Sequence, residues 1–415
     1  MELIGAFIAT VFLYSLVSKR IDGTLVTAPM LFTAAGAVAF ALPQGMRELV
    51  LDRNGFLLVA EIGLVLTLFS DASRVTLSAL SGNRNLPVRL LSSGMLLTIL
   101  LGLVAALLVL DGITVWEAGI LAAILAPTDA GLGTVIVNSE RVPARIRQAL
   151  NVEAGLNDGL AVPFLMLFIA LAAQTSEGAH TVLGRFLLEQ LGYGTLIGLG
   201  VGAAGGWLLD AASRRDWMAA PMAQLGLVAL PLLCMLLSEE TGASMFIAAF
   251  VGGLAVQIRF RNAGKHSIEF TEEWGQLFDF FVFFLFGLVV ARDAAQFSAA
   301  HFVYAALSLT VVRVAPVALA LVGTRLAPAT VLFVGWFGPR GLASIVLGLV
   351  YLDAAGAGSS TETIRLTVIA TVLVSIVAHG VTAMPGIGWY SRALARMPAD
   401  AAERQEAWQV ADKPL

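Results

Sequence analysis

Apolar segments of about 20 residues recur along nearly the whole of this chain, and each is long enough to cross a bilayer as a helix. Of the 415 residues, 58% are hydrophobic and 13% are charged, whereas soluble domains carry about 25% charged residues. The mean hydropathy is +0.86. The sequence therefore predicts an all-α polytopic membrane protein.

The apolar segments predict about 13 transmembrane helices, near residues 3–18, 24–42, 55–72, 87–110, 114–137, 150–174, 187–211, 219–238, 241–258, 274–291, 299–322, 329–351 and 363–384. In this prediction residues 1–390 form a single membrane unit, and residues 391–415 form a short cytoplasmic tail. The first segment has an acidic start and is followed by Lys19 and Arg20, which is the wrong charge order for a cleaved signal peptide.

Thirteen spans place the two termini on opposite sides of the membrane, and the basic residues predict which side is which. Cytoplasmic loops carry an excess of Lys and Arg. With the N-terminus outside, most of the 25 basic residues lie on the cytoplasmic side, and the outer loops hold only Arg47, Arg53, Arg185, Arg292 and Arg365. We therefore predict a multi-pass protein of the cell membrane (plasma or inner) with its N-terminus outside and its C-terminus in the cytoplasm.

The composition also argues against several kinds of chemistry. A single cysteine, Cys234, excludes a disulfide framework and a cysteine-ligated metal site. None of the four histidines is paired at ligand spacing, and no nucleophile elbow or His-Glu metal motif is present. The basic residues are spread over loops rather than clustered. We therefore expect no enzymatic activity, no bound cofactor and no nucleic-acid partner.

Two of the predicted spans are interrupted by residues that break helices. In the fifth, Pro127 removes a backbone donor and is followed by Thr-Asp-Ala-Gly-Leu-Gly. In the twelfth, residues 338–341 (Gly-Pro-Arg-Gly) interrupt the helix in the same way. Interrupted segments at corresponding positions of two halves are typical of an inverted-repeat transporter with a site at the membrane midplane.

The interruptions predict two inverted six-helix repeats whose broken helices cross. The first repeat covers about residues 1–174, a linker helix about 187–211, and the second repeat about 219–385. Crossed half-helices point their dipole ends at the centre of the membrane. There Asp129 can face amino-terminal ends, and Arg340 can face carboxy-terminal ends.

The acids at the start of the sixth span need compensation, because a carboxylate inside the membrane costs roughly 2.5–3.5 kcal/mol. Glu153 and Asn157 are four residues apart and share a helix face, whereas Asp158 is rotated by about 100° from Asn157. The span contains no cation, so Arg313 of the eleventh span is the obvious partner for Glu153. We expect these two residues to form a buried, structural ion pair.

Asp158 is then the carboxylate that we expect to work in transport. Desolvation favours protonation of a buried carboxyl group, so protons can compete for it near physiological pH. Oxygen ligands suit alkali ions, and Asp158, Asp129 and Thr128 can supply them. Competition between a proton and a monovalent cation at Asp158 is sufficient for ion/proton exchange.

Taken together, these motifs resemble those of the monovalent cation/proton antiporters, in particular the NhaP and sodium/proton exchanger branch with an Asn-Asp pair. The resemblance covers essentially the whole membrane portion. It rests on Thr128-Asp129, Glu153, Asn157-Asp158, Arg313, the stretch 338–341 and the stretch 375–385 (SIVAHGVTAMP).

The resemblance implies a 13-helix fold of the NhaA/NhaP type, in which a core domain moves against a dimerisation domain, and a homodimer surrounded by membrane lipids. It implies that Asp158 carries both ion and proton by alternating access, that the Glu153–Arg313 pair is structural, and that Arg340 has an electrostatic or structural role. Asn157 in place of a second aspartate resembles the electroneutral branch, which exchanges one cation for one proton. A role in pH homeostasis would follow.

Two positions depart from the family pattern. Ala130 follows Asp129 where many relatives have proline, and Ala154 follows Glu153 where relatives commonly have a serine whose oxygen helps to bind the ion. Na⁺ is the first expectation for the cation, and the missing hydroxyl leaves room for Li⁺ or K⁺, including a K⁺-selective antiporter of the same fold. A cation channel is a distant alternative, because the sequence contains no filter-like repeat.

The predicted spans also contain His379, Glu61 and Asp279. His379 is interpreted as a buried core histidine rather than a pH sensor, and the sequence assigns no role to Glu61 or Asp279.

Overall fold

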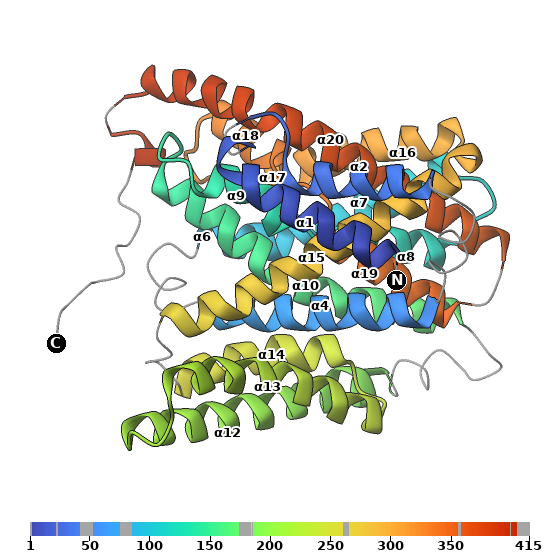
Figure 1. Ribbon diagram of the computed structural model, residues 1–415. Coiled ribbons are helices and arrows are strands. Elements are labelled where there is room, and N and C mark those ends of the chain that lie inside the picture. The colour runs from blue at the N-terminus through green and yellow to red at the C-terminus, as the bar shows by residue number, and fades with distance from the viewer. Residues whose placement is uncertain are drawn as a thin grey trace. The chain divides into compact units, whose positions relative to one another are not determined.

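The computed structural model describes residues 2–21, 24–41, 53–74, 85–173, 184, 186–259, 265–355, 358–398 and 400–404, and every element in these ranges is helical (Figure 1). The elements are α1 (Glu2–Ile21), α2 (Ala28–Phe40), α4 (Arg53–Arg74), α6 (Asn85–Arg89), η1 (Leu90–Gly94), α7 (Met95–Val109), α8 (Val115–Ile124), α9 (Ala130–Val137), α10 (Ala144–Ala172), η2 (Phe186–Tyr193), α12 (Gly194–Arg214), α13 (Ala220–Thr241), α14 (Met245–Arg259), α15 (Lys265–Asp293), η3 (Ala294–Gln296), α16 (Ala299–Leu309), α17 (Val311–Ala320), α18 (Pro328–Trp336), α19 (Leu342–Ala354), α20 (Ser359–Ala395) and η4 (Ala402–Arg404).

Many of these helices are apolar and long enough to cross a membrane. Among the described residues, 7 helices are long and apolar enough to cross a membrane. Four shorter apolar helices are also present: Ala28–Phe40, Val115–Ile124, Met245–Ile258 and Leu342–Asp353. The predicted all-α class is therefore confirmed, while the number of spans and the inverted repeats stay predictions. Several helices extend beyond the predicted spans. For example, α10 begins at Ala144, α15 begins at Lys265, and α20 continues to Ala395, into the predicted tail.

The chain divides into two compact units. Unit 1 comprises Met1–Phe56, Ser78–Asn157 and Phe280–Leu415, and unit 2 comprises Leu57–Leu77 and Asp158–Asp279. Helices α10 and α15 are continuous across these limits, so each contributes residues to both units. Both interrupted helices, α8–α9 and α18–α19, belong to unit 1.

In unit 2, α12 and α14 pack closely along a stripe of glycines, and Figure 1 shows α12, α13 and α14 side by side. Gly194, Gly198, Gly202 and Gly206 recur every four residues on α12 and are buried. A Cβ atom at Gly198 or Gly202 would collide with the backbone of α14. Small residues at this spacing let membrane helices approach until their backbones touch.

In unit 1, one apolar core joins α6, η1, α9, α10, α17, α18 and α20. Its buried members include Ile146 of α10, Phe333 of α18 and Tyr390 of α20. The rings of Phe333 and Tyr390 are stacked, with centroids 4.3 Å apart. This core holds the first turns of α10 against α18, and these two helices lead to the residues of the candidate site.

Both predicted interruptions are present. α8 ends at Ile124 and α9 begins at Ala130, so the gap contains Pro127. α18 ends at Trp336 and α19 begins at Leu342, so the gap contains the Gly-Pro-Arg-Gly stretch. The helix breakers identified in the sequence therefore act where they were expected to act.

The predicted span 299–322 is divided by a break that the sequence did not predict. α16 ends at Leu309 and α17 begins at Val311, with Thr310 between them. The Thr310 hydroxyl donates to the carbonyl of Ala306 at 2.5 Å. Such back-bonding by threonine often bends helices, and the backbone at Thr310 is not helical (φ −109°, ψ −92°), three residues before Arg313.

Candidate ion-binding site

Asp129 joins the two interrupted helices. It is the N-cap of α9, and its Oδ1 accepts a hydrogen bond from the Leu132 amide at 2.8 Å. Its Oδ2 accepts a second one, at 2.6 Å, from the amide of Leu342, the first residue of α19. One buried carboxylate therefore caps two half-helices, one from each interruption. A negative charge at this place interacts favourably with the positive dipole ends of both helices.

The two interrupted segments cross at a backbone contact. The Asp129 amide donates to the carbonyl oxygen of Pro339 at 2.8 Å. A Cβ atom at position 341 would overlap the Asp129 carboxylate, so the crossing requires Gly341. The Gly-Pro-Arg-Gly stretch thus combines a residue that breaks the helix with one that lets a second segment approach.

Arg340 completes the carboxy-terminal end of α8. Its guanidinium is fully buried, and Nη1 donates to the carbonyl oxygens of Ala126 and Pro127, the latter at 2.9 Å. Ser344, one turn later, donates to the carbonyl of Ile124 at 2.8 Å. The Ser344 bond satisfies a carbonyl group that the end of α8 leaves without an intrahelical partner. Arg340 binds two carbonyl groups just beyond that end, which places its positive charge near the negative end of the helix dipole.

Ser375 and His379 of α20 bridge the second interruption. Ser375 Oγ accepts a hydrogen bond from the Arg340 amide at 2.6 Å. His379 Nδ1 lies 3.2 Å from that Oγ, and His379 Nε2 lies 2.9 Å from the carbonyl oxygen of Trp336, the last residue of α18. His379 Nδ1 also lies 2.9 Å from the carbonyl oxygen of Ser375, and a neutral imidazole donates to one of these two carbonyls according to its tautomer. Hydrogen bonds from one turn of α20 therefore join the two sides of the gap.

The structure pairs Glu153 with Arg313. Arg313 Nη1 lies 2.6 Å from Glu153 Oε1, and each side chain is 3% exposed. The guanidinium packs against Gly338, where a Cβ atom would collide with it. The pair connects α10 to α17 beside the second interruption. Arg313, the partner predicted for Glu153 from the sequence, is therefore the residue with which it pairs.

Asn157, one turn after Glu153, connects α10 to the first interruption. Its Nδ2 donates to Oγ1 of Thr128 at 2.6 Å. Its Oδ1 is buried and accepts no hydrogen bond from the described residues. Buried polar atoms are normally satisfied, and an amide oxygen in this position is a suitable ligand for a hard cation.

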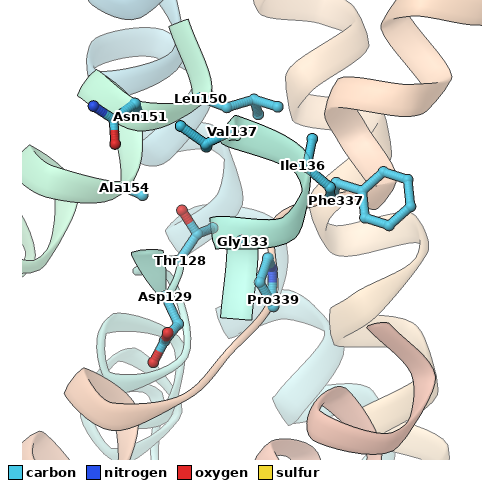
Figure 2. A pocket seen from close by; sticks show the side chains of 10 residues that line it. All are labelled: Thr128, Asp129, Gly133, Ile136, Val137, Leu150, Asn151, Ala154, Phe337 and Pro339. Carbon is cyan, nitrogen blue, oxygen red and sulfur yellow. The ribbon is translucent and has the colours of Figure 1, made fainter. Parts of the chain in front are cut away.

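A small cavity lies between the first interruption and α10 (Figure 2). Its walls include Thr128, Asp129, Asn151, Ala154 and Pro339. The space open to the centres of water molecules is ≈ 20 Å³, which is sufficient for one water or one bare cation of similar size. Ala154 presents a methyl group here, at the position where a hydroxyl was expected from the family pattern.

Asp158 continues the face of α10 that lines this cavity. It follows Asn151 by seven residues and Ala154 by four, and both spacings place residues on one helix face. Asp158 is 8% exposed. The next residue along the lining face is therefore a buried carboxylate.

Three other acids in the predicted spans lie elsewhere. Glu61 and Asp71 are half-buried on α4, and Asp279 is half-buried on α15. None of the three lines the cavity.

Ser344 and Asn151 were not identified as site residues from the sequence, and Ser375 entered only as the first residue of the stretch 375–385. Ser344 follows Arg340 by four residues and Ser375 precedes His379 by four, so helical spacing from those candidates could have found both serines. Asn151 precedes Asp158 by seven residues and follows the same rule. Spacing alone does not select them, because serines on membrane helices are common and usually bond their own helix.

A sequence profile described as "Sodium/hydrogen exchanger, transmembrane" matches residues 6–386, a range that includes both interruptions and the Glu153–Arg313 pair. The chain belongs to the sodium/hydrogen exchanger family. The family predicted from the sequence motifs is therefore confirmed, and the chain is a multi-pass membrane protein.

Relatives of this exchanger-family chain are distant in sequence. It is 25% identical over 422 residues to the "K(+)/H(+) antiporter NhaP" of Alkalimonas amylolytica, covering 97% of this chain and 71% of that protein. It is 27% identical over 270 residues to the "K(+)/H(+) antiporter NhaP2" of Shewanella sp. (strain ANA-3), covering 64% of this chain. The match spans only 45% of the Shewanella protein.

The fold matches a solved exchanger structure over nearly the whole of this chain. The sodium proton antiporter MjNhaP1 from Methanocaldococcus jannaschii at pH 8 superimposes with a TM-score of 0.77, covering 96% of this chain and 99% of that one at 19% identity. The antiporter fold predicted from the motifs is therefore confirmed.

Proposed function

We propose that this protein is a secondary active antiporter that exchanges one monovalent cation, Na⁺ in the first place, for one proton. Asp158 is the carrier for both. The protein alternates between two states that open Asp158 to opposite sides of the membrane. The cation and the proton cannot occupy the carboxylate together, and this competition couples their movements.

The observation that carries the proposal is the balance of buried charges in the described parts of α10, α17 and the interrupted helices. The buried acids are Asp129, Glu153 and Asp158, and the buried guanidiniums are Arg313 and Arg340. When all of these groups are ionised, one negative charge is in excess. One proton or one monovalent cation removes that excess, so both loaded forms are neutral and a 1:1 electroneutral exchange is favoured.

The cation ligands in this proposal are side-chain oxygen atoms. Asp158 supplies a carboxylate, and Asn157 Oδ1 is a buried acceptor. Each oxygen of Asp129 accepts one amide and keeps a lone pair for a further contact, and Thr128 supplies its hydroxyl oxygen. In this proposal the Glu153–Arg313 pair and Arg340 have structural and electrostatic roles and do not touch the ion.

K⁺ is the second candidate for the transported cation. Ala154 lines the cavity with a methyl group, so one oxygen ligand fewer is available to replace the hydration shell of the smaller, more strongly hydrated Na⁺. The relatives from Alkalimonas amylolytica and Shewanella are both named as K⁺/H⁺ antiporters.

The test is transport by purified protein in proteoliposomes with an imposed pH gradient. Equal concentrations of Na⁺, K⁺ and Li⁺ are added in turn, and proton movement is followed with a pH-sensitive dye, with and without a clamped membrane potential. We expect Asp158→Asn to abolish the cation-dependent signal. Asp353→Asn, which changes an exposed acid on α19, is the matched control and should keep the wild-type rate.

Wild-type exchange by the Asp158→Asn protein would remove Asp158 from the mechanism. A rate that depends on the clamped potential would contradict the 1:1 stoichiometry. The order of the Na⁺, K⁺ and Li⁺ rates decides between the two candidate cations.

We also propose that the antiporter works as a homodimer in the cell membrane, with its N-terminus outside and its C-terminus in the cytoplasm, and that it needs no bound cofactor and no nucleic acid. The distribution of basic residues supports the orientation. Accessibility labelling of single cysteines at the two ends, in a Cys234→Ala background, tests the orientation, and mass measurement in detergent tests the dimer.

A further inference from the structure

The short helix η4 (Ala402–Arg404) brings a buried acid from the C-terminal end of the chain to the helices of unit 1. Glu403 is only 2% exposed, although it lies in a polar segment predicted to be a simple tail. A buried carboxylate outside the ion site requires compensation from nearby donors.

Those donors are at the amino-terminal end of α18. Glu403 Oε1 accepts a hydrogen bond from the amide of Ala327, the N-cap residue of α18, at 2.7 Å. It accepts another from the hydroxyl of Thr330 at 2.8 Å. In a capping box, a Glu three residues after the N-cap accepts from the N-cap amide. That position is Thr330 here, and Glu403 makes the missing contact from a distant part of the chain.

The same segment is also joined to two other helices of unit 1. Arg145, in the first turn of α10, donates from Nη1 to the carbonyl oxygen of Ala402 at 2.5 Å. Arg404 Nη2 donates to the carbonyl oxygen of Leu394 on α20 at 2.9 Å. Thr330 Oγ1 is also 3.1 Å from the hydroxyl of Tyr390. The segment therefore connects the ends of α10, α18 and α20.

We propose that Glu403 is a positioning residue for transport, because it completes the amino-terminal cap of α18 and thereby holds the interruption at residues 337–341 in register. This inference rests on the proposed function of the site. α18 has only 9 residues between Ala327 and the interruption, and helices this short are marginal without terminal contacts. Trp336, whose carbonyl contacts His379, lies only about two turns from Ala327. Fraying that begins at Ala327 can therefore extend to the interruption.

The charge of Glu403 adds to the hydrogen bonds. An anion at the amino-terminal end of a helix is stabilised by the helix dipole, and α18 has no acid of its own in its first turn. Glu403→Gln keeps an oxygen acceptor for the Ala327 amide but removes the charge. Glu403→Ala removes both.

The experiment measures amide hydrogen exchange and transport on the full chain in lipid or detergent. Peptides that cover residues 326–332 report the cap of α18, and peptides that cover residues 114–118, at the capping box of α8, serve as the internal reference. For Glu403→Ala we expect exchange at the start of α18 to be about tenfold faster, as for loss of an N-cap. Transport should fall at least as much, and thermal unfolding should shift little.

Glu403→Gln should recover most of the amide protection and most of the transport rate, and this rescue separates positioning from a general loss of stability. Asp400→Ala, which changes an exposed acid in the same segment, is the matched control and should behave as wild type. Unchanged exchange at residues 326–332 in Glu403→Ala would overturn the inference. So would a uniform loss of protection over all peptides.

The two proposals fail in different ways. If the wild-type protein carries out no cation/proton exchange, the proposed function fails, whereas the amide measurement still reports whether Glu403 caps α18. If transport is present and Asp158-dependent but insensitive to Glu403→Ala, only the positioning role fails.

Discussion

The Oδ2 atom of Asp129 accepts a hydrogen bond from the backbone amide of Leu342 at 2.6 Å, so a residue of the first interruption caps a helix of the second. Its Oδ1 atom caps the helix that follows Asp129 itself. The two half-helices α9 and α19 therefore share one anion at their amino-terminal ends. A carboxylate that accepts a backbone amide from each of two helix ends holds both helices in place.

Replacement of Asp129 should be more damaging than loss of an ordinary cap. Asp129→Ala removes the cap of two helices, and because one cap contributes about 1 kcal/mol, we expect a loss of about 2 kcal/mol. Exchange activity should fall more than tenfold, since the crossing also positions Thr128. Thermal unfolding of the purified protein and proteoliposome transport are the measurements.

The matched control for Asp129 is Thr114→Ala, which removes a single cap at the start of α8, away from the crossing. We expect it to cost about 1 kcal/mol and to leave exchange near the wild-type rate. Equal behaviour of the two variants in both assays would contradict the shared-cap role of Asp129.

Loss of Arg313 should act mainly on stability. Arg313→Ala leaves Glu153 buried without its partner, and breaking such a pair costs about 3–5 kcal/mol. We expect a low yield and a lower unfolding temperature, measured by size-exclusion chromatography and thermal unfolding. The double variant Glu153→Leu, Arg313→Leu should recover much of the stability, because apolar residues often replace a buried pair without loss.

A stable but inactive Arg313→Ala protein would give Arg313 a direct part in transport. Failure of the double variant to recover stability would indicate that the charges themselves, and not the stranded partner, are required at this position.

His379 should tolerate glutamine but not leucine. The contact that His379 makes with the Trp336 carbonyl needs one donor at the tip of the side chain, and the glutamine amide can supply it. We expect His379→Gln to keep transport and its dependence on pH. We expect His379→Leu to lower transport about tenfold or more, because the Trp336 carbonyl then keeps only the Gly338 amide and α20 loses its contact with the end of α18. Proteoliposome transport from pH 6 to 9 is the measurement. A shifted pH profile in the glutamine variant would make His379 a proton-binding group instead of a structural one.

The interruptions and the ion pair were predictable from sequence for a simple reason. Charged residues inside membrane helices are rare and costly, so each of them must have a structural consequence. Proline alone does not mark a gap, since Pro163 and Pro231 lie inside continuous helices, but proline next to glycines and a charged residue does. Pro127 and the Gly-Pro-Arg-Gly stretch located the gaps, and the shortage of buried cations left Arg313 as the partner for Glu153.

The remaining contacts were not predictable because they join residues far apart in the chain through ordinary side chains. Ser344 and Ser375 bond carbonyl and amide groups of other helices, and a serine in an apolar helix carries no signal of its partner. The break between α16 and α17 at Thr310 was not predictable either, because many threonines back-bond without dividing a helix. Glu403 lies beyond the last predicted span, where the polar composition suggested only a solvated tail.

The crossing of the interrupted segments has a consequence for how this architecture is inherited. The hydrogen bond between the amide of residue 129 and the carbonyl of residue 339 involves main-chain atoms only. Replacement of either side chain therefore keeps its donor and acceptor, except that proline at position 129 would remove the amide donor. Mutation over long divergence can therefore exchange ligands and helix partners while the point where the segments meet persists. Homologues with different ion preferences can share this junction, and selectivity can evolve around it without redesign of the scaffold.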